Sequence, residues 1–224
     1  MSYISRQDLM SLKYKKLNPI TGSAKKIVIL SHGYGADCND LISIGEYWQR
    51  FLPEVCFVAP NAPTICQINP SGFEWFDLMQ TSQDKILEEM NLSLSKLDSF
   101  INEQLAEHQL AKQDLFLMGF SQGTMMSLHL ALSYKETIGG ILGYSGKIYN
   151  FDVLRNNINS KPPIILFHGT EDTIIPLEEM YASYEFLKDK LPHVEYKVFD
   201  HCGHSILPEA LSLGLDFIQS KINK

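Results

Sequence analysis

Basic residues are scarce in this chain relative to acidic ones. Its 224 residues include 19 lysines and arginines against 26 aspartates and glutamates, which gives a formal net charge of −7. Recognition of a phosphate backbone needs clustered Lys and Arg, so the composition argues against nucleic acid as a partner. The one basic cluster, Lys13–Lys16, is short, and we expect it to be a solvated strand edge.

Long hydrophobic runs are also missing. No apolar stretch approaches the roughly 20 residues of a membrane-spanning helix, so no transmembrane segment is expected. The N-terminal residues MSYISRQDLM contain no apolar signal-peptide core, and the C-terminal residues SKINK carry no lipidation motif. The four cysteines are scattered without metal-ligand spacing, which is typical of free thiols in a reducing compartment. A cytoplasmic protein without a metal site is the expectation.

Short apolar segments alternate with amphipathic ones along the chain. Six segments are expected to be buried strands, at 25–33, 55–63, 114–120, 138–146, 162–170 and 194–201. Helical patterns lie at 84–107, 124–134, 176–190 and 205–222. Strands that alternate with helices predict an α/β fold with a mostly parallel sheet and helices on both faces. A chain of this length fits a single domain, residues 1–224.

A serine and a glutamine interrupt the apolar stretch LFLMGFSQGTMMSLHLAL. Gly119 and Gly123 flank Ser121 in the pattern G-x-S-x-G, at the point where a predicted strand turns into a predicted helix. This pattern in this setting is the nucleophile elbow. The sharp turn strains the serine backbone and brings the neighbouring chain close, so the flanking positions suit residues without a Cβ. The hydroxyl then lies at a helix N-terminus, which favours negative charge.

A serine nucleophile needs a base, and the base needs an orienting acid. On an α/β-hydrolase the chain order is Ser, acid, His. His204 follows the last predicted strand and is the favoured base, and His201 on the same loop is its rival. Asp172, which follows the fifth predicted strand in HGTED, is the favoured acid. Glu171 beside it is expected to be a solvated loop charge.

The oxyanion of acyl transfer needs two preorganised N–H donors. The residue after the nucleophile, Gln122, supplies one amide, and the second is expected from the loop after an early strand. The segment LSHGYGAD fits, because its glycines around Tyr34 let the backbone approach a substrate closely. His32 in this loop precedes the serine, so it is expected to shape the loop rather than act as the base.

The segments SHGYGAD, APNAP, FEWFDL, GFSQG, HGTEDTIIP and GHSI together closely resemble the bacterial carboxylesterase and phospholipase/carboxylesterase family, which includes acyl-protein thioesterases and lysophospholipases. The resemblance covers roughly residues 25–222. It implies the α/β-hydrolase fold, with Ser121 as nucleophile, Asp172 as orienter and His204 as base. It also implies that the amides of Tyr34 and Gln122 form the oxyanion hole, although family members more often have leucine where Tyr34 stands. Relatives commonly form homodimers.

The predicted substrate site is a shallow, open groove with an apolar wall. Only about sixteen residues separate the strands ending at Gly146 and starting at Pro163, which leaves no room for a cap domain. The loop 61–83 is the longest irregular stretch, and long loops in compact domains are usually functional. The family resemblance implies that Trp75 helps to line the acyl site, and Leu78 and Met79 are expected in the same wall.

These features predict a serine carboxylesterase that hydrolyses esters of short to medium acyl chains through an acyl-enzyme. The substrate would be a small-molecule or lipid ester, and no metal or organic cofactor is implied. A lysophospholipase or an acyl-protein thioesterase is the alternative, since all these substrates present the same carbonyl. A serine peptidase and an inactive binding scaffold are more distant alternatives.

Overall fold

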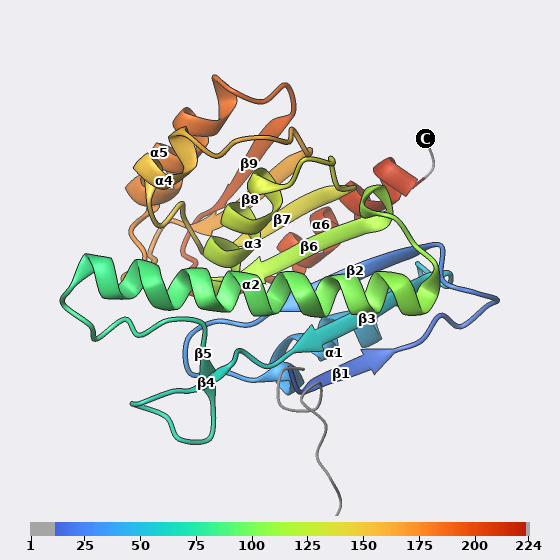
Figure 1. Ribbon diagram of the computed structural model, residues 1–224. Coiled ribbons are helices and arrows are strands. Elements are labelled where there is room, and N and C mark those ends of the chain that lie inside the picture. Colours follow the sequence, from blue (N-terminus) through green and yellow to red (C-terminus); the bar gives the residue numbers. More distant parts are fainter. Residues whose placement is uncertain (1–11, 223–224) are drawn as a thin grey trace, which may run out of the picture.

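The computed structural model describes residues 12–222. The expectation for MSYISRQDLM, and the last two residues of SKINK, lie outside the described residues. The centre of the molecule is a seven-stranded sheet in the order β1-β3-β2-β6-β7-β8-β9 (Figure 1). Every neighbouring pair is parallel except β1 with β3. This is the mostly parallel sheet of an α/β-hydrolase, as predicted.

The elements have the following bounds. The strands of the main sheet are β1 (Tyr14–Leu17), β2 (Lys26–Ser31), β3 (Val55–Pro60), β6 (Leu115–Phe120), β7 (Gly140–Tyr144), β8 (Ile164–Gly169) and β9 (Val194–Phe199). A separate hairpin is made of β4 (Thr64–Ile65) and β5 (Phe73–Glu74). The helices are α1 (Cys38–Trp48), α2 (Gln83–His108), the short 3₁₀ helix η1 (Lys112–Asp114), α3 (Gln122–Ser133), α4 (Phe151–Arg155), α5 (Leu177–Lys188) and α6 (Pro208–Ile222).

All six predicted strands and all four predicted helices are present. The sequence reasoning missed β1 because its residues, YKKL, are mostly polar. At this edge of the sheet Tyr14 and Lys15 are exposed, whereas Lys16 and Leu17 are partly buried. The expectation of a solvated strand edge for Lys13–Lys16 thus fails at Lys16, whose side chain is 14% exposed and pairs with Glu107. The reasoning also missed α1 and the five-residue helix α4. Between β7 and β8 the chain forms only α4 and its loops, so no cap domain is inserted there.

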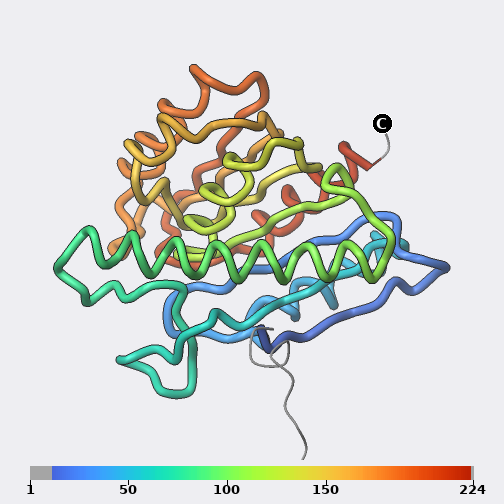
Figure 2. Tube along the Cα trace, viewed as in Figure 1, coloured from blue at the N-terminus to red at the C-terminus, as the bar shows by residue number. Residues whose placement is uncertain are grey.

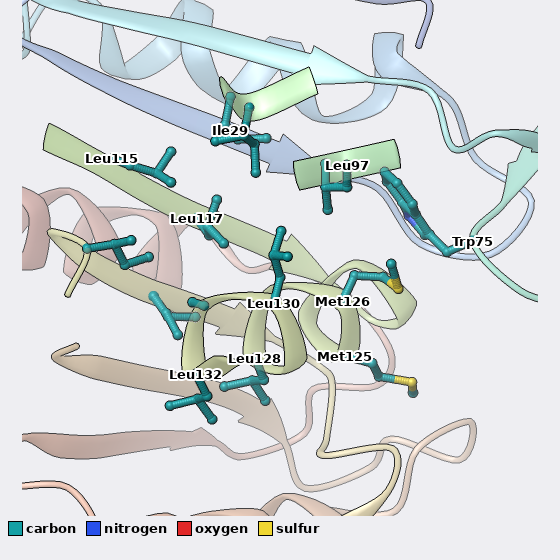
Figure 3. Close-up of a cluster of buried hydrophobic side chains, with 14 of the residues drawn as sticks. Ile29, Trp75, Leu97, Leu115, Leu117, Met125, Met126, Leu128, Leu130 and Leu132 are labelled. Atoms are coloured by element: carbon teal, nitrogen blue, oxygen red, sulfur yellow. The ribbon is translucent and has the colours of Figure 1, made fainter. Parts of the chain in front are cut away.

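Helices cover both faces of the sheet. The long helix α2 and helices α3, α4 and α5 lie on the face toward the viewer, and α1 and α6 lie behind the sheet (Figures 1 and 2). Helix α3 is apolar nearly all round, and every residue from Gln122 to Leu132 is buried. Figure 3 shows why: Leu128, Leu130 and Leu132 of α3 belong to a core cluster shared with Leu115 and Leu117 of β6.

The carboxyl ends of the parallel strands meet at one edge of the sheet. The loops after β2, β6, β8 and β9 all leave the sheet there. They carry Tyr34, Ser121, Asp172 and His204, respectively. Ligands bind at this edge in α/β folds of this type. Among residues 12–222, we find no helix with the length and hydrophobicity needed to cross a membrane.

Candidate active site

Ser121 lies in a strained turn between β6 and α3. Its φ of 53° and ψ of −114° fall outside the regions that side-chain-bearing residues ordinarily adopt. Such backbone strain costs on the order of 1–3 kcal/mol and persists only when the surroundings hold it. Here the Ser121 N–H donates to the carbonyl of Tyr144 at 2.8 Å. The Thr124 hydroxyl lies 2.7 Å from the carbonyl of Gly119 and braces the other side of the turn.

The two glycines of the elbow are required by close backbone contacts. A Cβ at Gly119 would lie 2.3 Å from the Gly123 carbonyl, and a Cβ at Gly123 would lie 1.9 Å from the carbonyl of Ser31. Neither position therefore accepts a side chain. The absence of side chains lets the N-terminus of α3 pack directly on the end of β2. This is the reason that the sequence predicted for the G-x-S-x-G spacing: the backbone approaches too closely for a Cβ at either glycine.

An acid and a histidine form a hydrogen-bonded pair beside this turn. The Asp172 carboxylate is fully buried, and its Oδ2 lies 2.8 Å from Nδ1 of His204. The other carboxylate oxygen accepts from the backbone N–H groups of Ile174 and Ile175, both at 2.9 Å. A proton on Nδ1 that donates to the carboxylate leaves the lone pair of His204 on Nε2, as a general base requires.

His204 also packs on the residue that precedes the serine. Its ring centroid is 4.9 Å from that of Phe120. The loop that carries His204 is drawn against the end of β8 at Gly169, where a Cβ would lie 2.1 Å from the carbonyl of Cys202. Within residues 12–222, the His204 ring forms its one hydrogen bond with Asp172. Ser121 and His204 line the same cavity.

A second histidine, which the sequence reasoning did not single out, contacts the same carboxylate. Nε2 of His168 lies 2.8 Å from the carbonyl of Ile175 and 3.4 Å from Oδ2 of Asp172. Burial lowers the pKa of His168, so the ring is neutral and donates from Nε2. It thereby holds the 172–175 turn that presents the carboxylate. The only signal in the sequence was its place at the start of HGTED.

The two rival residues pair with each other in solvent. Nδ1 of His201 lies 2.9 Å from Oε1 of Glu171, and the two side chains are 89% and 61% exposed. Neither His201 nor Glu171 lines the cavity beside Ser121. An exposed pair of this kind contributes little to stability. Of these four residues only His204 lines the cavity beside Ser121, and Asp172 is joined to that cavity through its hydrogen bond with His204.

The loop after β2 lies against Ser121. A Cβ at Gly33 would be 3.3 Å from the Cβ of Ser121. His32 is completely buried, and both its ring nitrogens are engaged: Nδ1 with the Gly33 carbonyl at 2.7 Å, and Nε2 with the N–H of Ala62 at 2.9 Å. Burial lowers the pKa of His32. A neutral ring with both nitrogens occupied shapes this loop and has no free nitrogen for base catalysis.

Residues 61–76 form hydrogen bonds with the loop after β2, residues 32–37, which we call the oxyanion loop after its predicted role. Gly35 donates its N–H to the Phe73 carbonyl at 2.9 Å, and Phe73 donates to the Ala36 carbonyl at 2.8 Å. The Asn69 amide donates to the Gly35 carbonyl at 2.7 Å. In the described part of the chain, we find no hydrogen bond for the N–H groups of Tyr34 and Gln122.

Trp75 is part of the core and not of the cavity wall, which corrects the expectation for this residue. Its side chain is 1% exposed, does not line the cavity, and belongs to a cluster with Leu97 and Met126 (Figure 3). Its indole Nε1 donates to the His32 carbonyl at 3.0 Å. The Gln122 side chain accepts from the Trp75 N–H at 2.9 Å. The tryptophan therefore joins the oxyanion loop to the serine turn from inside.

The cavity beside Ser121 and His204 has a volume of about 750 Å³. Leu78 and Met79 line it, and they are 40% and 60% exposed. Ile68 and Ile174 extend the apolar wall and are exposed to a similar degree. The wall is thus open to solvent. Among residues 12–222, we find no group of three or more His, Cys, Asp or Glu side chains placed to hold a metal ion.

Comparison with known proteins gives consistent matches over nearly the whole chain. A family model described as Phospholipase/Carboxylesterase matches residues 14–222. Acyl-protein thioesterase 1 of Gibberella zeae is 31% identical over 221 residues, covering 91% of this chain and 94% of that protein. Acyl-protein thioesterase 1 of Emericella nidulans is 32% identical over 201 residues, covering 81% and 84%. The crystal structure of esterase PE8 is similar with a TM-score of 0.88 and 35% identity, covering 94% and 99%.

Proposed function

The chain belongs to the phospholipase/carboxylesterase family, and from that premise we propose that it is a carboxylesterase in which Ser121, His204 and Asp172 act as nucleophile, base and orienting acid. That it is a serine hydrolase of ester or thioester bonds follows from the family and its esterase and thioesterase relatives. The observation that carries the assignment of residues is the 2.8 Å pair of His204 and buried Asp172, in one cavity with the strained Ser121.

The mechanism is acyl transfer in two steps. His204 takes the proton of the Ser121 hydroxyl through Nε2 as the oxygen attacks the substrate carbonyl. The oxyanion accepts hydrogen bonds from the amides of Tyr34 and Gln122, the second of which begins α3 and adds the helix dipole. His204 then protonates the leaving alcohol or thiol. Water attacks the acyl-enzyme by the reverse route, with Asp172 stabilising the imidazolium that forms each time.

The open apolar wall supports a preference for short to medium acyl chains. Each buried methylene gains about 0.8 kcal/mol if its surroundings are dry. Leu78 and Met79 are half in water, so the gain per methylene should be smaller and should end where the wall ends. We therefore expect activity to rise modestly from acetyl to butyryl or hexanoyl esters and then to level off.

A second candidate, the acyl-protein thioesterase, is supported by the names of the relatives and by the openness of the site. A cap over the cavity would exclude a protein-sized leaving group, and no cap domain is inserted between β7 and β8. Comparison of kcat/KM for an S-acylated peptide and for a p-nitrophenyl ester of the same chain length separates the two candidates. A thioesterase should favour the peptide.

The decisive test of the proposal is Ser121→Ala. Fluorophosphonate should label the native protein at Ser121, and the variant should keep its fold but lose labelling and about 10⁶-fold in kcat. His204→Ala should be nearly as severe, whereas His201→Ala is the matched control on the same loop and should be mild. A folded His201→Ala variant without activity, beside an active His204→Ala variant, would show that the base is assigned to the wrong histidine.

A further inference from the structure

Two parts of the lining of the catalytic cavity differ sharply in polarity. One is apolar and comes from the exposed side chains of Ile68, Leu78, Met79 and Ile174. The other is acidic and comes from the start of α1, where Asp37 and Asp40 line the cavity. Of the described residues, those that line the cavity include no Lys or Arg. The acids stand just beyond the oxyanion loop, three and six residues after Tyr34.

Asp37 and Asp40 have different structural roles. Asp37 caps α1: its two carboxylate oxygens accept from the backbone N–H and the side-chain amide of Asn39, both at 2.8 Å. Asp40 is exposed in the first turn of α1. In residues 12–222 we find no ion pair or hydrogen bond for its carboxylate, and the Ser43 hydroxyl donates to its backbone carbonyl at 2.8 Å.

The field of these carboxylates reaches the catalytic loops. Both act on the buried ring of His32, whose pKa they raise against the larger lowering effect of burial. The positive charge of Lys15 in β1 lowers the pKa of the Cys38 thiol at the start of α1, against the larger raising effect of burial. Lys15 does not line the cavity. A substrate group beside the oxyanion loop is therefore close to two negative charges and, among residues 12–222, to no lining cation.

We infer that Asp40, together with Asp37, selects substrates by the charge of the leaving group, favouring cationic leaving groups and disfavouring polyanionic ones. The inference rests on the proposed function. It names as substrates acyl esters or thioesters whose alcohol or thiol part is positively charged, such as an acylated peptide with lysines beside its acyl-cysteine. Acyl thioesters of a phosphate-bearing thiol are the disfavoured class.

The acyl chain and the leaving group take different parts of the cavity for a physical reason. An alkyl chain gains free energy on the apolar wall. Laid over Asp37 and Asp40, it would displace water from the carboxylates without replacing their hydrogen bonds, which is unfavourable. The leaving group is therefore the part of the substrate that meets the acids.

The effect should be modest because Asp40 is exposed. Unit charges several ångströms apart near a protein surface are partly screened by water and salt. We expect one charge to change the preference by roughly two- to fivefold at low ionic strength, with a smaller effect at high ionic strength. The salt dependence distinguishes an electrostatic preference from one based on shape.

Three hexanoyl thioesters test the inference. Their leaving thiols are thiocholine, its neutral isostere 3,3-dimethylbutanethiol, and 3-mercaptopropionate. The thiols differ in intrinsic reactivity, so the measured quantity is the cation-to-anion ratio of kcat/KM in each variant relative to the native protein. Asp40→Asn should lower this ratio roughly two- to fivefold, and Asp40→Lys should lower it further, by roughly four- to 25-fold.

Glu136→Gln is the matched control. Glu136 is exposed in the loop between α3 and β7, at the opposite edge of the sheet, so its loss changes net charge equally and should leave the ratio unchanged. If Asp40→Lys unfolds, the milder Asp40→Asn still decides. Hydrolysis of all three thioesters with an unaltered ratio in the Asp40 variants would overturn the inference and leave the proposed function standing. Failure of the native protein to hydrolyse any of them, with activity on p-nitrophenyl hexanoate retained, would overturn the inference alone; failure on that ester as well would overturn both.

Discussion

Replacing Trp75 with phenylalanine tests whether this residue holds the oxyanion loop or binds the acyl chain. The change removes the indole N–H that donates to the His32 carbonyl at 3.0 Å and leaves that buried carbonyl without its partner. An unsatisfied buried group costs about 1–3 kcal/mol. For a protein of this size each kcal/mol lowers Tm by about 2–4 °C, so Tm should fall by roughly 2–12 °C.

The effect on activity should be the same for every chain length. Loosening of the loop displaces the Tyr34 amide, and a misplaced oxyanion donor costs up to about 100-fold in kcat. Acetyl and hexanoyl esters both need this donor, so Trp75→Phe should lower kcat/KM for both by the same factor. Thermal unfolding and assays with p-nitrophenyl esters below their micelle concentrations give the two measurements.

Met79→Ala is the matched control from the cavity wall. Its side chain is 60% exposed, so truncation should change stability by no more than about 0.5 kcal/mol. It should lower hexanoyl activity by roughly two- to fourfold, from the loss of partly wet contact with one methylene, and spare acetyl activity. The reasoning would be refuted if Trp75→Phe kept its Tm and lost only hexanoyl activity, because Trp75 would then belong to the acyl wall.

Two further predictions concern the acid and a buried histidine. Asp172→Asn should lower kcat by about 10³- to 10⁴-fold with little change in KM, because it removes the acceptor that orients His204. The control Glu171→Gln should change kcat by no more than about twofold. Equal losses of kcat in steady-state assays of the two variants would contradict the assignment of Asp172. Burial lowers the pKa of His129 to about 4, below its unfolded value near 6.5. The stability that His129 provides is therefore complete above pH 6.5 and is lost as the pH falls toward 4, by about 2 kcal/mol at pH 5. Urea unfolding at pH 7 and pH 5 should show a smaller decrease in the free energy of unfolding for His129→Gln than for the native protein.

The serine turn and the loops that hold the candidate acid and base could be predicted because each depends on residues close together in the chain. The G-x-S-x-G turn needs two glycines within two residues of Ser121, and the close contacts at both glycines show why no other residue fits. The order of Ser121, Asp172 and His204 along the chain, and their positions after strands, follow from the alternation of parallel strands and helices. The assignment of roles to these residues stays a prediction until Ser121→Ala is measured.

Which side chains are buried, and which loops lie against one another, could not be predicted in the same way, because both depend on contacts between distant segments. FEWFDL is apolar enough for a cavity wall or a core, and only packing against Leu97 and Met126 puts Trp75 in the core. His168 meets Asp172 because the 172–175 turn folds back over the end of β8. The acidic lining arises because α1 starts just after the oxyanion loop, which places Asp40 in the same cavity as a serine 81 residues further along the chain.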